Sequence, residues 1–530
     1  MRPRGIFSLP RARLGLTHLL ALVLALLVTA CNSRALPPPP GAPPAPPRPK
    51  PGSTPPPHRA QVVVAEPGAI GPLDPALGAT GPERDVVVNV YDRLVELDPA
   101  LQPAAGLATG WRHAGATTWE FSLRKGVSFS DGEPFDAATV VAWFDRLRAT
   151  SLGGQDPLPS VSHVQRVDDA TVRFETREPD PLLPRRLASP GASITPPGPF
   201  GSGGGNSQAL VARPVGTGPY LAADVVPGER VVLVPNTRYW GAPPKVQEAE
   251  IRAIPDASAR AAALEQGAVD VALRLPPAEA PAVKATPGLA VPPVVDARRL
   301  SRVSLDTAAP GRLADPRVRQ ALNYAVDKQG IIDGILAGQA VQNATLTGQE
   351  AFGYCPVRAY PYDPARAQAL LQAAGVQDLT FKLELAYSSP EDGAIVQALA
   401  QSMAAAGIDA RPAPTSDPGG ARAWFGTTTV DVLDADESFR AVQDGGPSGL
   451  PAPFGGQALL LVQQERRETN DAKRADLACQ IHQVEREAAP VLFLWQENLL
   501  TGLSRKTVVW KVAGDGLLRL GRLTPVPPPG

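Results

Sequence analysis

Strand-like and helix-like segments alternate along this chain from about Ala60 onwards, and this order constrains its fold more than any other feature. The strand candidates are short and mostly rich in Val, Ile and aromatic residues, which favour a pleated, half-buried surface. They lie at 61–65, 172–176, 230–234, 250–254, 302–306, 381–387, 430–433, 491–495 and 508–512. No repeat period connects them. A mixed order of this kind predicts α/β lobes built around sheets.

The helix candidates begin at residues that can cap a helix. Asp136, Asp256 and Asp363 each stand just before such a segment, where a carboxylate can accept a hydrogen bond from a free backbone N–H. Gly267 and Gly375 close the second and third of these helices. The expected helices cover 137–148, 257–266, the stretch from Pro364 to Gly375, 316–328, 395–406 and 471–488.

The composition is that of a large globular protein. A length of 530 residues suggests three or four domains of typical size. Hydrophobic residues make up 43% and charged residues 19%, which argues against disorder as the main state. Because 51 Lys and Arg stand against 52 Asp and Glu, no surplus of cations is present to neutralise nucleic-acid phosphates. Three cysteines exclude a disulfide-rich scaffold and a cysteine-based zinc cluster.

The first thirty residues have the pattern of a secretory signal peptide. Four arginines precede an apolar run from Leu14 to Ala30, and the run ends in Val28-Thr29-Ala30-Cys31. That ending resembles the lipobox of bacterial lipoproteins, in which the cysteine is acylated and becomes the new N-terminus. The alternative is an uncleaved membrane anchor, for which the run is short. Loss of the four arginines lowers the formal net charge from −1 by four units, to −5.

A proline-dominated stretch from Leu36 to Pro57 follows the cysteine. Such a composition favours polyproline II, an extended spacer of about 3.1 Å per residue. We interpret residues 31–59 as a tether that holds a globular body away from a membrane. The other interpretation is a PxxP ligand for an SH3-like partner.

The segment 119–137 reads Trp-Glu-Phe-Ser-Leu-Arg-Lys-Gly-Val-Ser-Phe-Ser-Asp-Gly-Glu-Pro-Phe-Asp-Ala. It resembles the signature stretch of the peptide/nickel/oligopeptide class of bacterial extracellular solute-binding proteins, family 5. Further matches to the same family follow in the expected order: Val90-Tyr91-Asp92-Arg93-Leu94-Val95, Gly216-Thr217-Gly218-Pro219-Tyr220, Asn236 with Tyr239-Trp240, Asp256 with Gly267-Ala268-Val269-Asp270, 315–327, and Tyr362-Asp363-Pro364 before Leu370-Leu371. Together they span most of the chain from about Val62 to Trp495.

The resemblance implies an α/β, two-lobed periplasmic-binding-protein-like fold of type II, whose lobes are joined by a hinge. The larger lobe would contain two subdomains. Subdomain I would comprise 60–85, 212–300 and 500–526, subdomain II would be 86–211, and the second lobe would be 301–499. Hinge crossings would lie near 303–306 and near 498–502.

The resemblance also implies a function. Solute, expected to be a peptide, would be enclosed between the lobes and handed to the transmembrane permease subunits of an ABC importer. The protein would act as a monomer in the cell envelope, in the periplasm or at the outer face of a membrane, anchored by a lipid on Cys31. No cofactor, metal, nucleic-acid partner or catalytic activity is expected.

Ligand contacts are predicted at six positions. In peptide-binding members of the family an Asp after a strand holds the ligand ammonium, and here Asp436, then Asp434, match best. Tyr220, Tyr239 and Trp240 can line a small-molecule cleft, although aromatic residues in such loops also pack internally. Ser389 stands where dipeptide-binding relatives place an Arg that grips the ligand carboxylate, so a tight dipeptide clamp is not expected.

Two cysteines remain for the folded body. Cys355 and Cys479 both fall in the expected second lobe, and in an oxidising compartment they could form a disulfide. Two buried thiols are the alternative, because the sequence gives no distance between them. Three of the five histidines, His113, His163 and His482, lie in the folded body without metal-ligand spacing, which argues against a bare nickel ion as the solute.

Two other functions stay open beside the transport receptor. A lipoprotein of the same fold could sense a ligand without feeding a permease. A secreted hydrolase with a cleft between α/β lobes is the third reading, although H-E-x-x-H, G-x-x-x-x-G-K-[ST] and G-x-S-x-G motifs are absent from the sequence.

Overall fold

A computed structural model of the protein describes ten stretches of the chain: 61–77, 81–150, 156–197, 213–307, 311–376, 381–388, 392–415, 422–430, 432–443 and 456–526. The expected signal peptide, Cys31, the proline-rich tether and Ser389 lie outside these stretches.

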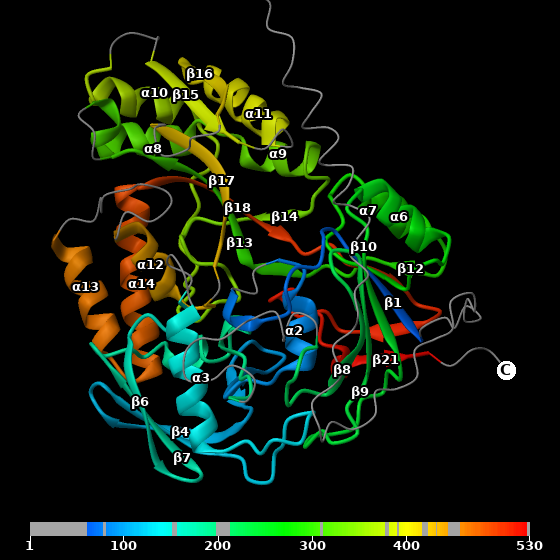
Figure 1. The fold of residues 1–530 in the computed structure, drawn as a ribbon. Helices are drawn as coiled ribbons and strands as arrows, with labels where there is room; N and C mark the ends of the chain where they lie inside the picture. The colour runs from blue at the N-terminus through cyan, green and yellow to red at the C-terminus, as the bar shows by residue number, and fades with distance from the viewer. Residues whose placement is uncertain are drawn as a thin grey trace, which may run out of the picture. The chain divides into compact units, whose positions relative to one another are not determined.

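Strand β1 (Val62–Glu66) lies inside a seven-stranded sheet within the described residues. It is buried along its whole length, as its unbroken run of apolar residues predicts. Val62 and Val64 face a core that includes helix α2 (Arg84–Val90). Val63 and Ala65 face the opposite core, under α6 (Ala257–Glu265) and α7 (Ala280–Ala285). The strand order is β12 (Leu289–Ala290), β19 (Gly502–Ser504), β11 (Val271–Ala272), β1, β10 (Ala249–Ala253), β9 (Arg230–Pro235) and β8 (Tyr220–Val226) (Figure 1).

A second, antiparallel sheet has four strands and contains the start of the signature stretch, residues 119–123. Its order is β4 (Ala108–Gly115), β5 (Thr118–Leu123), β7 (Thr171–Thr176) and β6 (Val161–Asp168). After β5 the chain turns through Gly126 and Gly132, whose positive φ values of 74° and 101° favour glycine. Asp136 then accepts a hydrogen bond from the Thr139 N–H at 2.9 Å and begins α3 (Ala137–Thr150). The signature residues therefore build a strand, a turn and a capped helix.

A third sheet has six strands. Its order is β14 (Ala340–Gln342), β18 (Val491–Asn498), β13 (Val295–Leu305), β17 (Ala423–Thr429), β15 (Phe381–Tyr387) and β16 (Ile408–Pro414). Helices α8 (Pro316–Tyr324), α10 (Pro364–Ala373) and α11 (Gly393–Ala404) lie with β15 and β16 in Figure 1, and they share one hydrophobic core with the sheet. Leu322, Leu371 and Leu399 are the buried leucines that these three helices contribute.

Two small sheets and the remaining helices complete the described elements. The small sheets pair β2 (Val95–Leu97) with β3 (Pro103–Ala105) and β20 (Val508–Trp510) with β21 (Leu523–Pro525). The helices are α2 (Arg84–Val90), α4 (Leu183–Arg186), α6 (Ala257–Glu265), α7 (Ala280–Ala285), α8 (Pro316–Tyr324), α9 (Lys328–Gly334), α10 (Pro364–Ala373), α11 (Gly393–Ala404), α12 (Ala435–Gln443), α13 (Gly456–Arg467) and α14 (Asp471–Ala488).

Two of the elements expected from the sequence are wrong. The strand placed at 430–433 lies at 423–429 instead, where Trp424, Phe425 and three threonines pair with β13. Aromatic and β-branched residues there outweigh the valines further on. The helix expected over 316–328 is two helices, because Asp327 caps α9 by accepting a hydrogen bond from the Gly330 N–H at 2.9 Å.

The core of the six-stranded sheet contains one buried ammonium group. Lys328 is 4% exposed, and its Nζ donates to the carbonyl oxygens of Asn323 at 2.7 Å and Tyr360 at 3.4 Å. Burial lowers the pKa of Lys328 from the ordinary 10.5 to about 7.

The protein should therefore gain stability relative to a Lys328→Met variant as pH rises from about 7 to about 10. In that window the unfolded chain binds the proton and the folded chain does not, so the free energy of unfolding rises with pH. Urea unfolding of both proteins at a series of pH values measures the difference. Lys382→Met, at an exposed position, is the control; it keeps Lys328, and its free energy of unfolding should rise with pH as that of the parent does. Equal slopes for Lys328→Met and the parent would contradict the prediction.

Candidate functional site

The chain passes between the seven-stranded and the six-stranded sheets at two neighbouring places. The first passage, 291–294, joins β12 to β13, and the second, 499–501, joins β18 to β19. The Leu499 N–H donates to the Val294 carbonyl oxygen at 2.7 Å, so the passages run side by side. The second agrees with the crossing expected near 498–502. The first comes earlier than the expected 303–306, because β13 already begins at Val295.

A cavity of about 610 Å³ lies beside these passages, which is enough for a small organic solute. Its wall takes residues from both sheets and from the start of α2. Cations outnumber anions in this wall. The arginines are Arg84, Arg260, Arg274, Arg298 and Arg299, and the acids are Asp296 and Glu497.

Arg274 holds two buried carboxylates together at the back of the cavity. Its guanidinium contacts Glu66 Oε2 at 2.6 Å and Asp85 Oδ2 at 2.5 Å. Its φ of 51° lies in the left-handed region, which is unusual for a residue other than glycine and marks a site held by its surroundings. Burial and the neighbouring Asp85 raise the pKa of Glu66, whereas Arg274 and Arg84 outweigh burial at Asp85 and lower its pKa.

Arg260 is occupied by main-chain oxygens. Its Nε donates to the Leu273 carbonyl at 3.1 Å, Nη1 to the Ile254 carbonyl at 2.8 Å and Nη2 to the Arg274 carbonyl at 3.0 Å. These bonds fix the loops after β10 and β11. Arg260 is therefore a structural cation in the cavity wall.

Arg84 differs from these two arginines. Its Nε is buried without a hydrogen-bond partner, and its guanidinium forms no ion pair within the described part of the chain. Burial and the positive charges of Arg298 and Arg274 lower the pKa of Arg84 to about 10. Asp85 and Asp296 oppose this shift, because their carboxylates attract the guanidinium.

The start of β13 forms the facing part of the wall. The Arg298 N–H donates to Asp296 Oδ1 at 3.0 Å, and burial raises the pKa of Asp296. Arg299 is more open: its side chain is 47% exposed and lies 3.7 Å from Glu497 Oε2. The two consecutive arginines thus place positive charge on this side of the cavity as well.

Helix α4 contacts residues 433–437, which lie just before α12 and in its first turn. Arg185 Nη1 donates to the Leu433 carbonyl oxygen at 3.4 Å, and its Nε lies 3.5 Å from Asp434 Oδ2. Arg186 Nη2 donates to Glu437 Oε2 at 3.2 Å. The space between these segments is a cavity of only about 10 Å³, room for about one water molecule. No solute of peptide size fits there in this conformation.

Replacing Arg185 by alanine should loosen this contact. The variant loses charged hydrogen bonds to Leu433, to the Leu101 carbonyl at 3.1 Å and to Gln102 at 2.9 Å. Hydrogen exchange of the backbone amides in 432–437 should become faster by about tenfold or more. Arg177→Ala, on an exposed arginine before the same helix, is the control. Unchanged exchange in Arg185→Ala would show that Arg185 does not hold this contact.

Buried charges behind this contact link α12, α13 and α14. Arg474 is 2% exposed and pairs with Asp434 and, at 2.6 Å, with Glu465. Arg466 Nε pairs with Asp436 Oδ1 at 2.6 Å. Burial raises the pKa of Glu465 to about 8. The chain's own arginines thus hold its buried carboxylates in place.

The five predicted ligand contacts that the structure describes lie outside the wall of the 610 Å³ cavity. Asp434 and Asp436 belong to the ion pairs just described and are buried. Tyr220 is buried in the core of the seven-stranded sheet. As ligand contacts these residues stay predictions.

Trp240 and Tyr239 lie against the motif that begins at Val90. Trp240 Nε1 donates to Asp92 Oδ2 at 2.7 Å, and Thr217 Oγ1 donates to the same oxygen at 3.0 Å. Arg124 lies over the Trp240 ring at 4.1 Å, and Tyr239 packs beside it with ring centroids 5.2 Å apart. Burial raises the pKa of Asp92 to about 6. Three family-like motifs therefore meet at one carboxylate.

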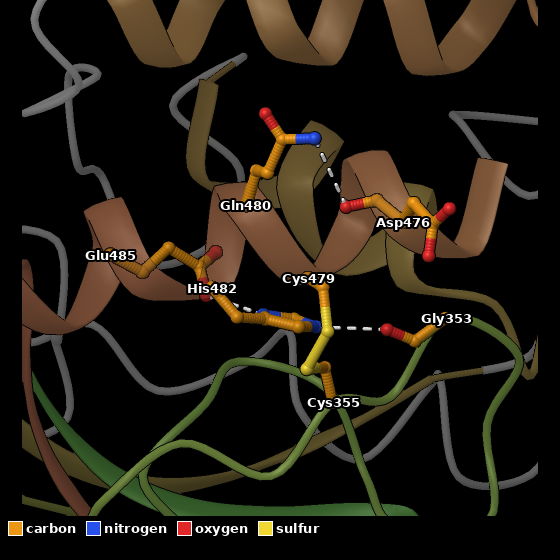
Figure 2. The surroundings of a disulfide bond; sticks show 7 residues. All are labelled: Gly353, Cys355, Asp476, Cys479, Gln480, His482 and Glu485. Carbon is orange, nitrogen blue, oxygen red and sulfur yellow. Dashed lines mark hydrogen bonds and ion pairs between the residues drawn. A yellow bond between two sulfur atoms is a disulfide. The ribbon is translucent and has the colours of Figure 1, made fainter. Parts of the chain in front are cut away.

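Cys355 and Cys479 form a disulfide, one of the two alternatives that the sequence left open. The bond joins the loop after β14 to helix α14, as Figure 2 shows. The buried His482 lies beside it, with Nδ1 2.9 Å from Glu485 Oε2 and Nε2 3.2 Å from the Gly353 carbonyl oxygen. The loop is thus attached to the helix by a covalent bond and a neighbouring polar contact.

Two features are absent from the described residues. No group of three or more His, Cys, Asp and Glu side chains there is arranged to hold a metal ion. In the same part of the chain, no helix combines the length and the apolar character that crossing a membrane requires.

The arginines of the 610 Å³ cavity were not predicted from the sequence. Arg84, Arg274 and Arg298 are separated by long stretches of chain, and only the pairing of β1 with β11 and the passage into β13 bring their segments together. The sequence contains one signal that could have indicated these arginines. Two adjacent arginines, 298 and 299, stand in a strand beside a passage between sheets, where apolar residues are the norm.

The fold is that of the two-lobed periplasmic binding proteins, an α/β class in which a hinge joins the lobes. The structure of HbpA2 from Haemophilus parasuis has a TM-score of 0.77 at 22% identity, and the match covers 88% of this chain and 99% of that one. DppA from Helicobacter pylori in complex with the peptide STSA has a TM-score of 0.73 at 23% identity, over 88% and 98% of the two chains. At these identities the likeness shows the fold alone.

The family follows from the sequence. Residues 102–449 match the family model described as bacterial extracellular solute-binding proteins, family 5 Middle. The chain belongs to this family, as its motifs predicted.

Relatives of known name are 28–30% identical to this chain over the aligned residues. A probable D,D-dipeptide-binding periplasmic protein of Escherichia coli is 28% identical over 56% of this chain and 59% of its own length. The dipeptide-binding protein of Escherichia coli is 30% identical, over 60% of this chain and 63% of its own length. The match thus spans less than two thirds of either relative.

Proposed function

We propose that this chain is a lipid-anchored receptor outside the cytoplasm, which captures a peptide or a similar small solute between its lobes and delivers it to the permease subunits of an ABC importer. The observation that carries the proposal is the 610 Å³ cavity beside the two passages between the sheets. A solute there touches both lobes next to the hinge, so its binding can favour one arrangement of the lobes that a membrane partner recognises.

The names of the relatives support a peptide-like solute. Two Escherichia coli relatives are named for binding D,D-dipeptides and dipeptides. A Salmonella relative, 28% identical over 66% of this chain, is named for binding glutathione. A nickel-binding relative exists in Escherichia coli. The cavity wall of this chain is rich in arginine, which does not suit a bare cation. We therefore propose a peptide-like solute and no catalysis.

The N-terminal sequence supports export and anchoring. The arginine-rich start, the apolar run and the Val28-Thr29-Ala30-Cys31 ending suit cleavage before an acylated Cys31. The proline-rich segment 31–59 would then separate a monomeric body from the membrane, in the periplasm or at an outer face.

The lobe boundaries expected from the family suit the sheets. All seven strands of the sheet that contains β1 fall in 60–85, 212–300 and 500–526, the proposed subdomain I. The four-stranded sheet falls in 86–211, the proposed subdomain II. The proposed second lobe, 301–499, contains the six-stranded sheet apart from the start of β13.

Native mass spectrometry of the full chain, purified in detergent from cells that process it, tests the proposal. The expected result is a protein with an acyl mass on Cys31 and a carried-over solute that is released on unfolding. A Cys31→Ser variant should lack the acyl mass and keep the solute. Cells without the protein should lose uptake of the released solute.

Three outcomes would contradict parts of this proposal. An unmodified Cys31 would remove the lipid anchor. Normal uptake in cells without the protein would favour a ligand sensor of the same fold. An empty protein whose melting temperature no solute raises would contradict solute capture, because a ligand at one hundred times its Kd should add about 2.7 kcal/mol of stability.

A further inference from the structure

We propose that the disulfide between Cys355 and Cys479 sets the strength of the contact between α4 and the start of α12, so that a thiol reductant weakens this contact. The contact joins the proposed subdomain II to the proposed second lobe. The inference therefore rests on the proposed function and adds a regulation to it. We call the contact the latch. Its residues are Leu101 and Arg185 on one side and Phe352, Leu433 and Asp434 on the other.

Arg185 is held in place by its own side of the latch. Its Nη1 donates to the Leu101 carbonyl oxygen at 3.1 Å, and its Nη2 donates to Gln102 Oε1 at 2.9 Å. Leu101 has a φ of 59°, in the left-handed region, which is unusual for leucine and marks a position held by its surroundings. Its buried side chain lies in one hydrophobic cluster with Ala351 and Leu433. Both residues thus contact the other side of the latch from a fixed position.

Phe352 connects α4 with α14. The guanidinium carbon of Arg185 lies over its ring, 5.0 Å from the ring centre, and that of Arg474, on α14, lies 4.7 Å from the same centre. The face of an aromatic ring attracts a cation. Asp434 pairs with both arginines, and it attracts Arg185 where Arg474 repels it. The latch therefore depends on the position of Phe352 relative to α14.

The disulfide fixes that position. Phe352 belongs to a loop that runs without helix or strand from β14 to α10. Its N–H donates to the Leu433 carbonyl oxygen at 3.1 Å, and its carbonyl oxygen accepts from the Ala435 N–H at 2.9 Å. Cys355 follows in the same loop and is bonded to Cys479, on the helix that carries Arg474. The covalent bond thus limits how far Phe352 can move from Arg474.

A dithiol reductant can open the bond by thiol–disulfide exchange. Cys355 and Cys479 are both half-buried, so they are accessible to a small reagent. A thiolate of the reductant attacks one sulfur and forms a mixed disulfide, and the other cysteine leaves as a thiolate that takes up a proton. The second thiol of the reductant then forms the disulfide of the reductant and releases the first cysteine. Two electrons pass from the dithiol to the protein, which keeps two thiols and a looser loop.

The reduction equilibrium of the full chain with dithiothreitol tests the inference. Coupling between two sites acts in both directions, so a broken latch should make the disulfide easier to reduce. Arg185→Ala should raise the equilibrium constant for reduction by about fivefold or more. Alkylation of the free thiols of Cys355 and Cys479 followed by mass spectrometry measures the reduced fraction.

Arg146→Ala is the matched control for Arg185→Ala. It removes a buried ion pair between α3 and Asp74, and neither residue of this pair belongs to the latch. The variant therefore loses stability without a change in the latch. Its equilibrium constant for reduction should equal that of the parent.

Hydrogen exchange gives a second readout on the far side of the latch. The backbone N–H groups of Arg186 and Leu187 donate within α4, which has no covalent link to the loop. Reduction of the parent should speed their exchange about fivefold or more, as Arg185→Ala does in the oxidised protein. Reduction of Arg185→Ala should add little, because the latch is already broken. A stabilising osmolyte keeps the reduced protein folded, and protected amides in β1 verify this.

Two results would overturn the inference. The first is a reduction constant that Arg185→Ala raises no more than Arg146→Ala does. The second is unchanged exchange in α4 after reduction of the parent while β1 stays protected. If β1 also loses protection, the reduction constants decide alone. Neither measurement needs a solute, so a failure here leaves the receptor function standing. An empty protein that no solute stabilises would contradict the receptor function and leave the coupling of disulfide and latch intact.

Discussion

Replacing Arg474 by alanine should lower the free energy of unfolding by about 3–5 kcal/mol. The Arg474 side chain is 2% exposed, and the side chains of its partners, Asp434 and Glu465, are 0% exposed. Its removal leaves two carboxylates buried without their main cation. Arg185, 3.5 Å from Asp434, offsets only part of this loss. Urea unfolding followed by circular dichroism measures the change.

Two controls separate this effect from the general loss of an arginine. Arg411→Ala removes a pair whose side chains are 64% and 36% exposed, and it should cost at most about 1 kcal/mol. A triple variant with Arg474→Met, Asp434→Asn and Glu465→Gln removes all three charges and should recover much of the stability. If Arg474→Ala is no less stable than Arg411→Ala, these ion pairs do not contribute as the structure indicates.

Removal of the disulfide should destabilise the protein by up to about 5 kcal/mol. Cys355 and Cys479 are separated by 124 residues, and a cross-link over a loop of that length removes much entropy from the unfolded chain. The double variant Cys355→Ser and Cys479→Ser should therefore unfold at a lower urea concentration than the parent. The bond also fixes a loop that runs without helix or strand from β14 to α10.

A reducing agent provides the matched control for the double variant. It should lower the stability of the parent to that of the variant and leave the variant unchanged. A parent that keeps its stability after complete reduction would show that the disulfide contributes little.

Much of the fold follows from local sequence patterns. The strand at 381–387 and the helix at 471–488 have the bounds that alternation and capping predict. The family motifs predicted the two-lobed architecture. Turn and cap residues in these motifs, such as Gly132 and Asp136, form the connection from β5 to α3. The predicted bounds of a strand were wrong where pairing with a distant strand decides its position. The strand predicted at 430–433 lies at 423–429, where β17 pairs with β13.

The candidate site could not be predicted in the same way. An acid that follows a strand looks the same in the sequence whether it meets a ligand or an arginine of its own chain. Only the structure brings Arg474, from a distant helix, to Asp434. The same applies to Arg84, whose lack of an acceptor depends on segments far away in the chain.

The paired passages at 291–294 and 499–501 have a mechanical consequence. Rotation about an axis moves nearby atoms little and distant atoms far. A solute beside the passages lies close to such an axis, because Glu497, Asn498, Leu499 and Leu500 line its cavity. The contact of α4 with Asp434 joins the proposed subdomain II to the proposed second lobe, so a fluorescent reporter of occupancy is best attached there.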